Sequence, residues 1–333
     1  MKKGAIFLLL FYLFITKASA QSFVDTPEIQ TSVSMNIAGK VDSIAELTLA
    51  MRVMESGAGL QKTVTSGDSV ITVPDTSLLL LEERTLKFNE DGALTEERTG
   101  KTNGKTVELK DFTTTTYQYK KGRLIAKVNY RDKALIDSAV YIYQKGRLWK
   151  QDIYDNKKKR SGRILYALNP DNKLLTISNK NAQNALVNMT RIKYNENYEL
   201  VETALHDNTM RLVSTRTYVV ERDTADRRHV MIFDFAKPDT ATGMVSYLLD
   251  DNDNHLEDVV QDEQKNVTYY STAHYDSLNN LTSQTVFTTE KLQIACKYVY
   301  DSNGNWIEKR IYHNDAPHRM MKRTIYYHRE AKP

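Results

Sequence analysis

The segment Tyr298–Tyr312 constrains the fold most, because its residue order predicts one complete β-hairpin. An alternating strand ends at Tyr300, the turn Asp301–Asn305 follows, and a second strand begins at Trp306. A three-residue hairpin loop usually ends in one left-handed residue, and Gly304 suits that position because a Cβ would clash there. We therefore expect Tyr300 to face Trp306 across the strands, a contact worth roughly 0.2–1 kcal/mol.

Copies of this hairpin recur upstream, so the chain is predicted to be a β-hairpin repeat. Phe88–Leu94 keeps the three-residue loop, with Gly92 at its left-handed position. Tyr119–Leu124 and Tyr143–Leu148 have a two-residue Lys-Gly loop, and each places a tyrosine opposite the leucine just past the turn. Degenerate copies are expected at Tyr166–Leu174, Tyr194–Leu200, Tyr275–Leu281 and Leu248–Leu256, with Tyr198 and Asn279 at the left-handed position of two of them. A period of about 20–50 residues is the signature of a repeat architecture, and the aromatic residues before the first four turns lie 31, 24 and 23 residues apart.

The expected fold is all-β, a curved antiparallel meander of repeated β-hairpins with one half-buried face. In the hairpin at 117–130, one face is predicted to carry Tyr117, Tyr119, Leu124, Ala126, Val128 and Tyr130, and the other Gln118, Lys120, Arg123, Ile125, Lys127 and Asn129. The predicted division is a signal peptide at 1–20, a tether and lead-in strands at 21–84, and the hairpin-repeat domain at 85–333. Within the lead-in, 51–54 is expected to pair with 61–64.

Residues 1–20 have the organisation of a secretory signal peptide. Two lysines precede an apolar run at 5–15, and Ala18–Ala20 gives a small-x-small cleavage site. We therefore expect export across the inner membrane to the periplasm, the outer surface or the exterior, with no transmembrane segment after cleavage; a retained N-terminal anchor is the alternative. Gln21 stands where a bacterial lipoprotein would need cysteine. Cleavage removes three lysines and no acid, so the net charge falls from +4 to +1, which argues against a nucleic-acid partner.

The turn motifs resemble those of the YD-repeat (RHS-like) family of secreted bacterial proteins, and the chain is similar to the short members of that family. The matching residues are Tyr300-Asp301 with Gly304-Asn305-Trp306, Tyr275-Asp276 with Leu281, Tyr119 with Gly122-Arg123-Leu124, Tyr143 with Gly146-Arg147-Leu148, and a lead-in of Gly39-Lys40-Val41 with Ile44 and Glu46. The resemblance implies antiparallel hairpins laid side by side in a curved sheet. Large family members close such a sheet into a shell around a toxin, and this chain is expected to have too few units for that.

No pattern in the sequence predicts catalytic, cofactor-binding or metal-binding residues, so a non-enzyme is expected. Asp250–Gln261 begins like a calcium loop, but histidine and glutamine replace the required glycine and glutamate, which favours a polar turn. His313 and His318 flank a turn without a helix to bring them together, which argues against zinc. Cys296 alternates with apolar residues and is expected in the core. The basic run Lys157–Arg160 is expected to be a solvated loop.

Six Asp-Ser/Thr-apolar triplets form a further pattern, for which two interpretations stay open. The triplets are Asp42-Ser43-Ile44, Asp68-Ser69-Val70, Asp137-Ser138-Ala139, Asp223-Thr224-Ala225, Asp239-Thr240-Ala241 and Asp276-Ser277-Leu278. They resemble the acceptor motif of a general O-glycosylation system in some bacterial envelopes, which implies modified hydroxyls. The other interpretation is ordinary turn chemistry, because most of them fall at predicted turns.

Three functions are compatible with these patterns. The first is an exported, non-catalytic β-repeat protein of the bacterial cell envelope, a binding or scaffold module with an envelope protein or a glycan as partner. Its tyrosine rows, together with Trp149 and Trp306, would supply a stacking surface or a core. The second is an envelope hydrolase of glycan or peptide, which requires converging carboxylates or histidines with shifted pKa values. The third is an outer-membrane barrel, which lysine and arginine on both strand faces disfavour.

Overall fold

The computed structural model describes residues 37–53, 61–66, 69–74, 76–102, 109–169, 173–223, 225, 227–237 and 240–328. The expected signal peptide and the tether lie outside these ranges. Across the described ranges the regular structure is β-strand, without α-helix. In the same ranges, no helix is long and apolar enough to cross a membrane.

The described residues form twenty-two strands, numbered here in chain order. Their bounds are β1 (Val41–Val53), β2 (Gln61–Ser66), β3 (Ser69–Pro74), β4 (Thr76–Phe88), β5 (Leu94–Lys101), β6 (Lys110–Lys120), β7 (Arg123–Arg131), β8 (Ala134–Gln144), β9 (Arg147–Asp155), β10 (Arg160–Leu168), β11 (Leu174–Asn181), β12 (Leu186–Tyr194), β13 (Leu200–Asp207), β14 (Leu212–Arg222), β15 (Arg228–Lys237), β16 (Thr240–Leu249), β17 (His255–Asp262), β18 (Val267–Tyr275), β19 (Leu281–Phe287), β20 (Lys291–Tyr300), β21 (Trp306–His313) and β22 (Ala316–Tyr327).

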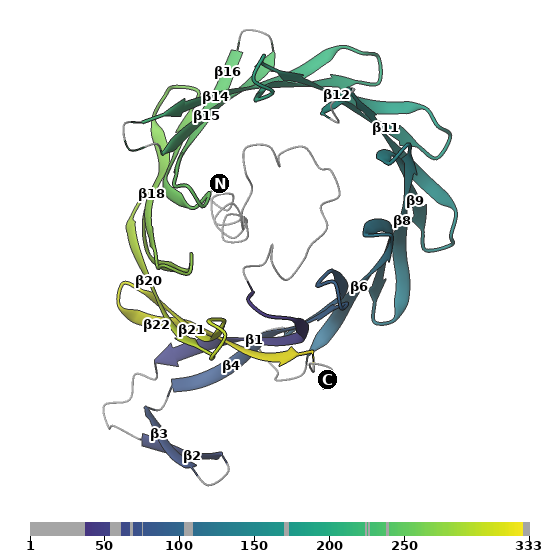
Figure 1. The fold of residues 1–333 in the computed structure, drawn as a ribbon. Coiled ribbons are helices and arrows are strands. Elements are labelled where there is room, and N and C mark those ends of the chain that lie inside the picture. The colour runs from purple at the N-terminus through teal and green to yellow at the C-terminus, as the bar shows by residue number, and fades with distance from the viewer. Residues whose placement is uncertain are drawn as a thin grey trace.

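Twenty of these strands form one closed antiparallel barrel (Figure 1). From β4 to β22 each strand pairs with its neighbour in sequence, and β1 closes the ring between β22 and β4. We call this closure the seam. Strands β2 and β3 pair with each other as a separate two-stranded sheet. The predicted all-β antiparallel meander is confirmed, and it is more specific than predicted, because the sheet closes on itself into a barrel.

β-bulges explain how the sheet curls enough to close. In the β6–β7 hairpin, Gln118 faces Ala126 while Tyr119 faces Leu124, so Ile125 is an extra residue in the second strand. The same one-residue shift falls just before Phe88, Tyr143, Tyr194, Tyr275 and Tyr300. A bulge bends its strand and increases the local right-handed twist. Repeated around the ring, this bending supplies the curvature that designed barrels also obtain from bulges.

The bulge overturns part of the predicted face assignment in the hairpin at 117–130. Tyr117 pairs with Lys127, and Gln118 pairs with Ala126. Because one residue of register moves every later side chain to the opposite face, Ala126 and Val128 lie on the face of Gln118 and not on that of Tyr117. The sequence alternates as far as Tyr130, but the structure follows the predicted faces only as far as Leu124.

The predicted aromatic–aliphatic pairs at the turns are confirmed where the motif is intact. Tyr300 faces Trp306, Phe88 faces Leu94, and Tyr119, Tyr143, Tyr194 and Tyr275 face Leu124, Leu148, Leu200 and Leu281. One degenerate copy differs from the prediction, since Leu168 and not Tyr166 faces Leu174. At 248–256, where only the turn was expected to remain, Leu249 faces His255. In both, an aliphatic residue takes the position that an aromatic residue holds elsewhere.

Seven of the described turns share one design, built on the aspartate that opens the turn. At Asp301 a side-chain oxygen accepts hydrogen bonds from the backbone N–H groups of Asn303 and Asn305, both at 2.9 Å. Gly304 has a φ of 81°, so the predicted left-handed residue is confirmed. The carboxylates of Asp155, Asp207, Asp223, Asp250, Asp262 and Asp276 each bind the second and fourth N–H groups after them in the same way. The aspartate thus satisfies the loop backbone, as expected of an Asx turn.

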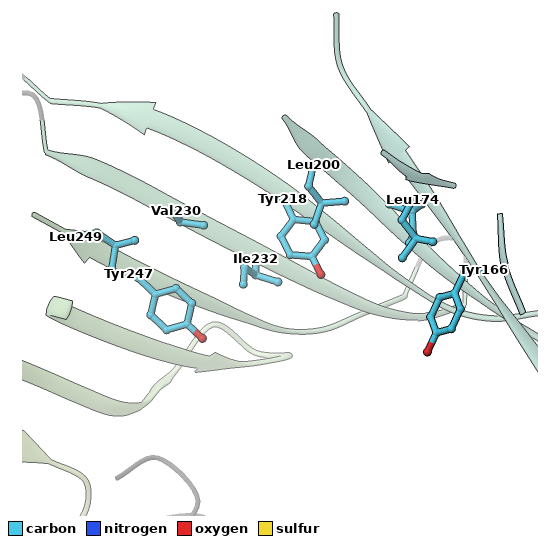
Figure 2. Packing of buried hydrophobic residues seen from close by; sticks show 9 residues of the cluster. Tyr166, Leu174, Leu200, Tyr218, Val230, Ile232, Tyr247 and Leu249 are labelled. Atoms are coloured by element: carbon cyan, nitrogen blue, oxygen red, sulfur yellow. The ribbon is translucent and has the colours of Figure 1, made fainter. Parts of the chain in front are cut away.

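The buried side chains gather on one face of the barrel wall. Cross-strand partners share a face, so pairs such as Tyr218–Ile232 and Val230–Tyr247 can be followed from strand to strand. The cluster that contains them projects from one side of β10–β16 (Figure 2). The buried clusters around Leu94, Leu124 and Val286 lie on that same face. Side chains converge on the concave side of a barrel, so we assign this as the inward face.

Two strands of the lead-in, β1 and most of β4, belong to the barrel, whereas β2 and β3 do not. β1 lies between β22 and β4, and the predicted domain boundary at 84/85 falls inside β4. The expected pairing of 51–54 with 61–64 is wrong: β1 pairs with β4, and β2 pairs with β3.

Candidate functional site on the inward face

Several tyrosine hydroxyls, which we call the tyrosine collar, lie at the rim that holds the β4–β5, β6–β7, β16–β17 and β18–β19 turns. Tyr119 donates from its hydroxyl to the carbonyl oxygen of Leu94 at 2.8 Å, and Tyr143 donates to that of Leu124 at 3.0 Å. Tyr275 and Tyr298 make the equivalent bonds to His255 and Leu281. Each hydroxyl therefore reaches the first residue after the turn of the preceding hairpin. Burial raises the pKa of Tyr119 and of Tyr275 to about 12, so the hydroxyls stay protonated donors.

The seam closes at this rim through Asn305. Its side-chain oxygen accepts from the N–H of Ala38 at 2.6 Å, and its Nδ2 donates to the carbonyl of Ala38 at 2.8 Å. The same nitrogen donates to the hydroxyl of Tyr327, which in turn donates to Asp301. Burial acts to raise the pKa of Asp301, but hydrogen bonds from Tyr327 and the turn backbone hold it below its usual value.

A charged cluster lies further along the inward face of the seam. Nε of Arg323 is 2.7 Å from Oε2 of Glu46, which joins β22 to β1. The Arg323 guanidinium also lies over the ring of Trp306, 3.4 Å from its centroid. On the neighbouring strands Arg84 pairs with Glu97 at 2.8 Å, and Lys101 pairs with Glu82 at 3.6 Å. Burial lowers the pKa of Arg323 although Glu46 acts in the opposite direction.

Lys309 on β21 adds a second cation to this cluster. It pairs with Tyr298 and Met321, and its Nζ lies 5.4 Å from the centre of the Tyr298 ring. Within the part of the chain that the structure describes, no carboxylate lies within ion-pair distance of Lys309. Burial lowers its pKa, and the positive charge of Arg323 lowers it further. We call Glu46, Tyr298, Trp306, Lys309 and Arg323 the seam cluster, an arrangement suited to holding an anion.

The nearest approach to a hydrolytic site is a buried polar chain on β17–β19. Nδ1 of His255 lies 2.6 Å from Oδ1 of Asp258, and Oγ of Ser271 lies 3.4 Å from Oδ2 of the same carboxylate. Gln284 donates to Ser271, which is 1% exposed. The carboxylate lies between the serine and the histidine. A nucleophilic serine must contact the histidine that takes its proton, so this order does not form a catalytic triad.

The two histidines at the β21–β22 turn are in contact, contrary to the expectation that nothing brings them together. The rings of His313 and His318 stack with centroids 3.8 Å apart and an interplanar angle of 15°. Burial lowers both pKa values, that of His318 to about 4. Stacked rings do not direct two nitrogens at one ion. Across the described residues, no group of three or more histidine, cysteine, aspartate or glutamate side chains is arranged to hold a metal.

The other residues singled out in the sequence lie in turns, in the buried face or on the surface. Asp250 uses one carboxylate oxygen for the N–H groups of Asn252 and Asn254 and the other for the Asn254 amide. Cys296 is buried on the inward face, as predicted, and burial raises its pKa. Lys157–Lys159 are exposed in a turn. Trp149 is 44% exposed, in contrast to Trp306 in the seam cluster.

The Asp-Ser/Thr-apolar triplets fall in different surroundings. Ser277 is exposed in a turn, where Asp276 accepts from the N–H of Leu278. Ser43 and Ser138 instead lie within β1 and β8, so the prediction that most triplets fall at turns is wrong for these two. Asp68, Thr224 and Asp239 lie outside the described residues. Glycosylation of the triplets stays a prediction.

Sequence reasoning missed the tyrosine hydroxyl bonds and the seam cluster. The hydroxyl partners lie in a different hairpin, so no local pattern points to them. The sequence held one signal for the cluster. Arg319 and Arg323 are an even number of residues apart, so they share a strand face, and the β21–β22 pairing brings Lys309 to that face.

No protein-family model matches the chain, and no curated protein matches it. Among solved structures, the chain is similar to a porin-like protein from Bacteroides uniformis, with 14% identity, 87% of this chain and 98% of that chain covered, and a TM-score of 0.35. A porin-like protein from Bacteroides vulgatus is 10% identical over 86% of this chain and 98% of its own, with a TM-score of 0.27. A chain of the TcdB2-TccC3-Cdc42 structure is 12% identical over 71% of this chain and 19% of its own, with a TM-score of 0.17. Likenesses this weak carry no functional argument, so the proposals below rest on sequence and geometry.

Proposed function

We propose that the chain is an exported, non-catalytic β-barrel protein of the bacterial cell envelope that acts as a binding or scaffold module. The observation that carries the proposal is the seam cluster, in which Glu46 pairs with Arg323 while Lys309 has no carboxylate at ion-pair distance among the described residues, beside two aromatic rings. Export is supported by the signal-peptide organisation of residues 1–20. The resemblance to short YD-repeat proteins supports the same class.

The pKa shifts of the collar tyrosines and of the turn aspartates do not suit general acid–base catalysis. A general acid or base works best with a pKa near the operating pH. Burial raises the pKa of the collar tyrosines, and turn hydrogen bonds lower that of aspartates such as Asp276 and Asp301, so both kinds of group move away from neutrality. The polar chain at Ser271 lacks the serine–histidine contact of a hydrolase. These features are what a rigid framework requires.

The barrel wall favours an aqueous environment over a lipid one. A membrane-spanning barrel needs a continuous apolar band on its outer face, and charges there are destabilising. The face opposite the inward one carries Asp152 bound to Arg163 at 2.5 Å and to Lys150 at 3.5 Å. On the same face Arg310 lies 2.6 Å from Glu308. The inward face carries the seam charges, so ion pairs are present on both faces of the wall, and we propose a water-soluble envelope protein.

Cell fractionation followed by capture from envelope extract tests the proposal. The tagged chain is expected in the periplasmic or extracellular fraction without detergent, and it is expected to retain an envelope component. That component should be lost with Lys309→Met and kept with Lys297→Met, a lysine over a tyrosine ring on the outward face of the adjacent strand. Retention of the chain in the cytoplasm, release only by detergent, or capture of nothing beyond the tag control would contradict the proposal.

A further inference from the structure

Three cations converge on the inward face of β21 and β22. Lys309 faces Met321, and Arg319 and Arg323 lie two residues to either side of Met321. Both arginines are therefore diagonal neighbours of Lys309, a relation that brings side chains within about 7–8 Å of one another. Ile311, which pairs with Arg319, also pairs with the buried Cys296, so Arg319 shares the inward face. Like charges at such positions destabilise a sheet.

The other inward charges at the seam are matched one to one. Glu46 pairs with Arg323, Glu97 with Arg84, and Glu82 with Lys101. Within the described ranges, neither Lys309 nor Arg319 has an ion pair with a carboxylate. A partly buried cation without a partner costs free energy. The excess of two positive charges therefore calls for anionic groups from outside the described wall.

We propose that this strip binds a ligand that carries two or more carboxylates, one for Lys309 and one for Arg319, and this inference rests on the binding role proposed above. Glu46 provides the precedent, because its carboxylate already holds Arg323 in the same surroundings. The planar guanidinium of Arg319 matches a carboxylate with two parallel hydrogen bonds. The Tyr298 ring lies beside Lys309 and the Trp306 ring beside Arg323, and the two rings limit the hydration of these cations.

The closed wall restricts the kind of ligand. Each barrel strand has a neighbour on both sides, so the wall offers no free edge to which an extended peptide could add as a strand. Recognition must then come from side chains. A barrel of sixteen to eighteen strands already encloses more than its side chains fill, and this one has twenty. The carboxylates would come from a free polycarboxylate or from the uronic acids of a glycan.

Calorimetric titration of the purified chain tests this inference directly. The probes are citrate, hexagalacturonate, inorganic phosphate and neutral maltohexaose. We expect citrate or hexagalacturonate to bind and maltohexaose not to bind, and the tighter of the two identifies the source. Lys309→Met and Arg319→Gln should each weaken binding at least tenfold, equivalent to about 1.4 kcal/mol. Lys297→Met, the outward control, should leave it unchanged.

Several outcomes would overturn the inference. They are the absence of binding by both carboxylate probes, tighter binding of phosphate than of citrate, and carboxylate binding that Lys309→Met leaves intact. Thermal unfolding of each variant guards against misfolding, because removing an unpaired cation should not lower the melting temperature. If the probes fail while capture of an envelope component still depends on Lys309, only the ligand class is wrong. If both fail, the binding role itself is wrong.

Discussion

The hairpins near the seam and the β14–β15 hairpin build the same wall in different ways. In β20–β21 a bulge shifts the register just before Tyr300, and tyrosine hydroxyls bind the neighbouring hairpin. In β14–β15 the register runs unshifted up to the turn, and the inward face is filled by pairs such as Val220–Val230. Asp223 still organises the β14–β15 turn. Both hairpins therefore have an Asx turn. They differ in that β20–β21 combines a bulge with tyrosine hydroxyl bonds, whereas β14–β15 combines an unshifted register with aliphatic packing.

This difference separates curvature from packing. Bulged hairpins bend the sheet and leave an aromatic residue at the rim that needs a partner for its hydroxyl. The unbulged hairpin bends less and belongs to a nine-residue buried cluster around Val230. The barrel closes because enough of its hairpins are bulged.

The largest expected effect tests whether the two regions unfold together. Leu94 is fully buried near the seam, so Leu94→Ala should lower the free energy of unfolding by roughly 2–5 kcal/mol. Val230→Ala in the middle cluster should cost less, because fewer atoms are removed. Because the ring is closed, both variants should unfold in one transition. Urea unfolding followed by circular dichroism and by tryptophan fluorescence measures this, and separated transitions in either variant would show that the regions are independent.

The next prediction compares the β20–β21 turn, which lies at the seam, with the β16–β17 turn, which lies away from it. Asn305→Ala removes the partners of both backbone groups of Ala38, so we expect a loss of roughly 2–3 kcal/mol. Asn254 occupies the same position in its turn, but its side-chain amide donates to the side chains of Asp250 and Asn279 and not to a backbone group. Asn254→Ala should cost roughly 1 kcal/mol. Equal losses in denaturant titrations would mean that Asn305 does not hold the seam.

The sequence sufficed for those features that local chemistry determines. The left-handed residues at Gly92, Gly304 and Asn279 and the pairs across the turns follow from a few adjacent residues. The bulge at Ile125 was not predictable from alternation, because residues 126–130 keep alternating as if no residue had been added. Closure by β1 depends on a partner strand more than 260 residues away, so it has no local signal.

The candidate site was even less accessible. Lys309 and Arg323 stand fourteen positions apart, and only the β21–β22 register makes them diagonal neighbours. Glu46 joins them from the opposite end of the chain. Charges on both faces of a strand look like solvent-exposed residues until the pairing and the inward direction are known.

A smaller effect isolates the collar hydroxyls. Tyr143→Phe removes the bond to the Leu124 carbonyl and keeps the ring, so we expect a loss of about 1 kcal/mol. The matched control is Tyr326→Phe, whose side chain is 54% exposed and outward. That variant should stay within about 0.5 kcal/mol of the parent. If Tyr143→Phe changes the free energy of unfolding as little as Tyr326→Phe does, the collar tyrosines contribute through apolar packing and not through their hydroxyl bonds.

The smallest expected effect is a pH dependence at the β21–β22 turn, which closes the rim opposite the collar. Burial, His313 and Arg319 lower the pKa of His318 from 6.5 to about 4. The unfolded chain therefore binds more protons between these values, so the contribution of His318 to stability is complete above pH 6.5 and is lost as the pH falls toward 4. The imidazole is partly exposed, and solvent screening keeps the effect small. His318→Gln should flatten the stability profile in this window, and His274→Gln, at an exposed position, should leave it unchanged. If the His318→Gln profile keeps the slope of the parent, His318 does not govern acid sensitivity in this window, and His313, whose pKa burial also lowers, becomes the remaining source.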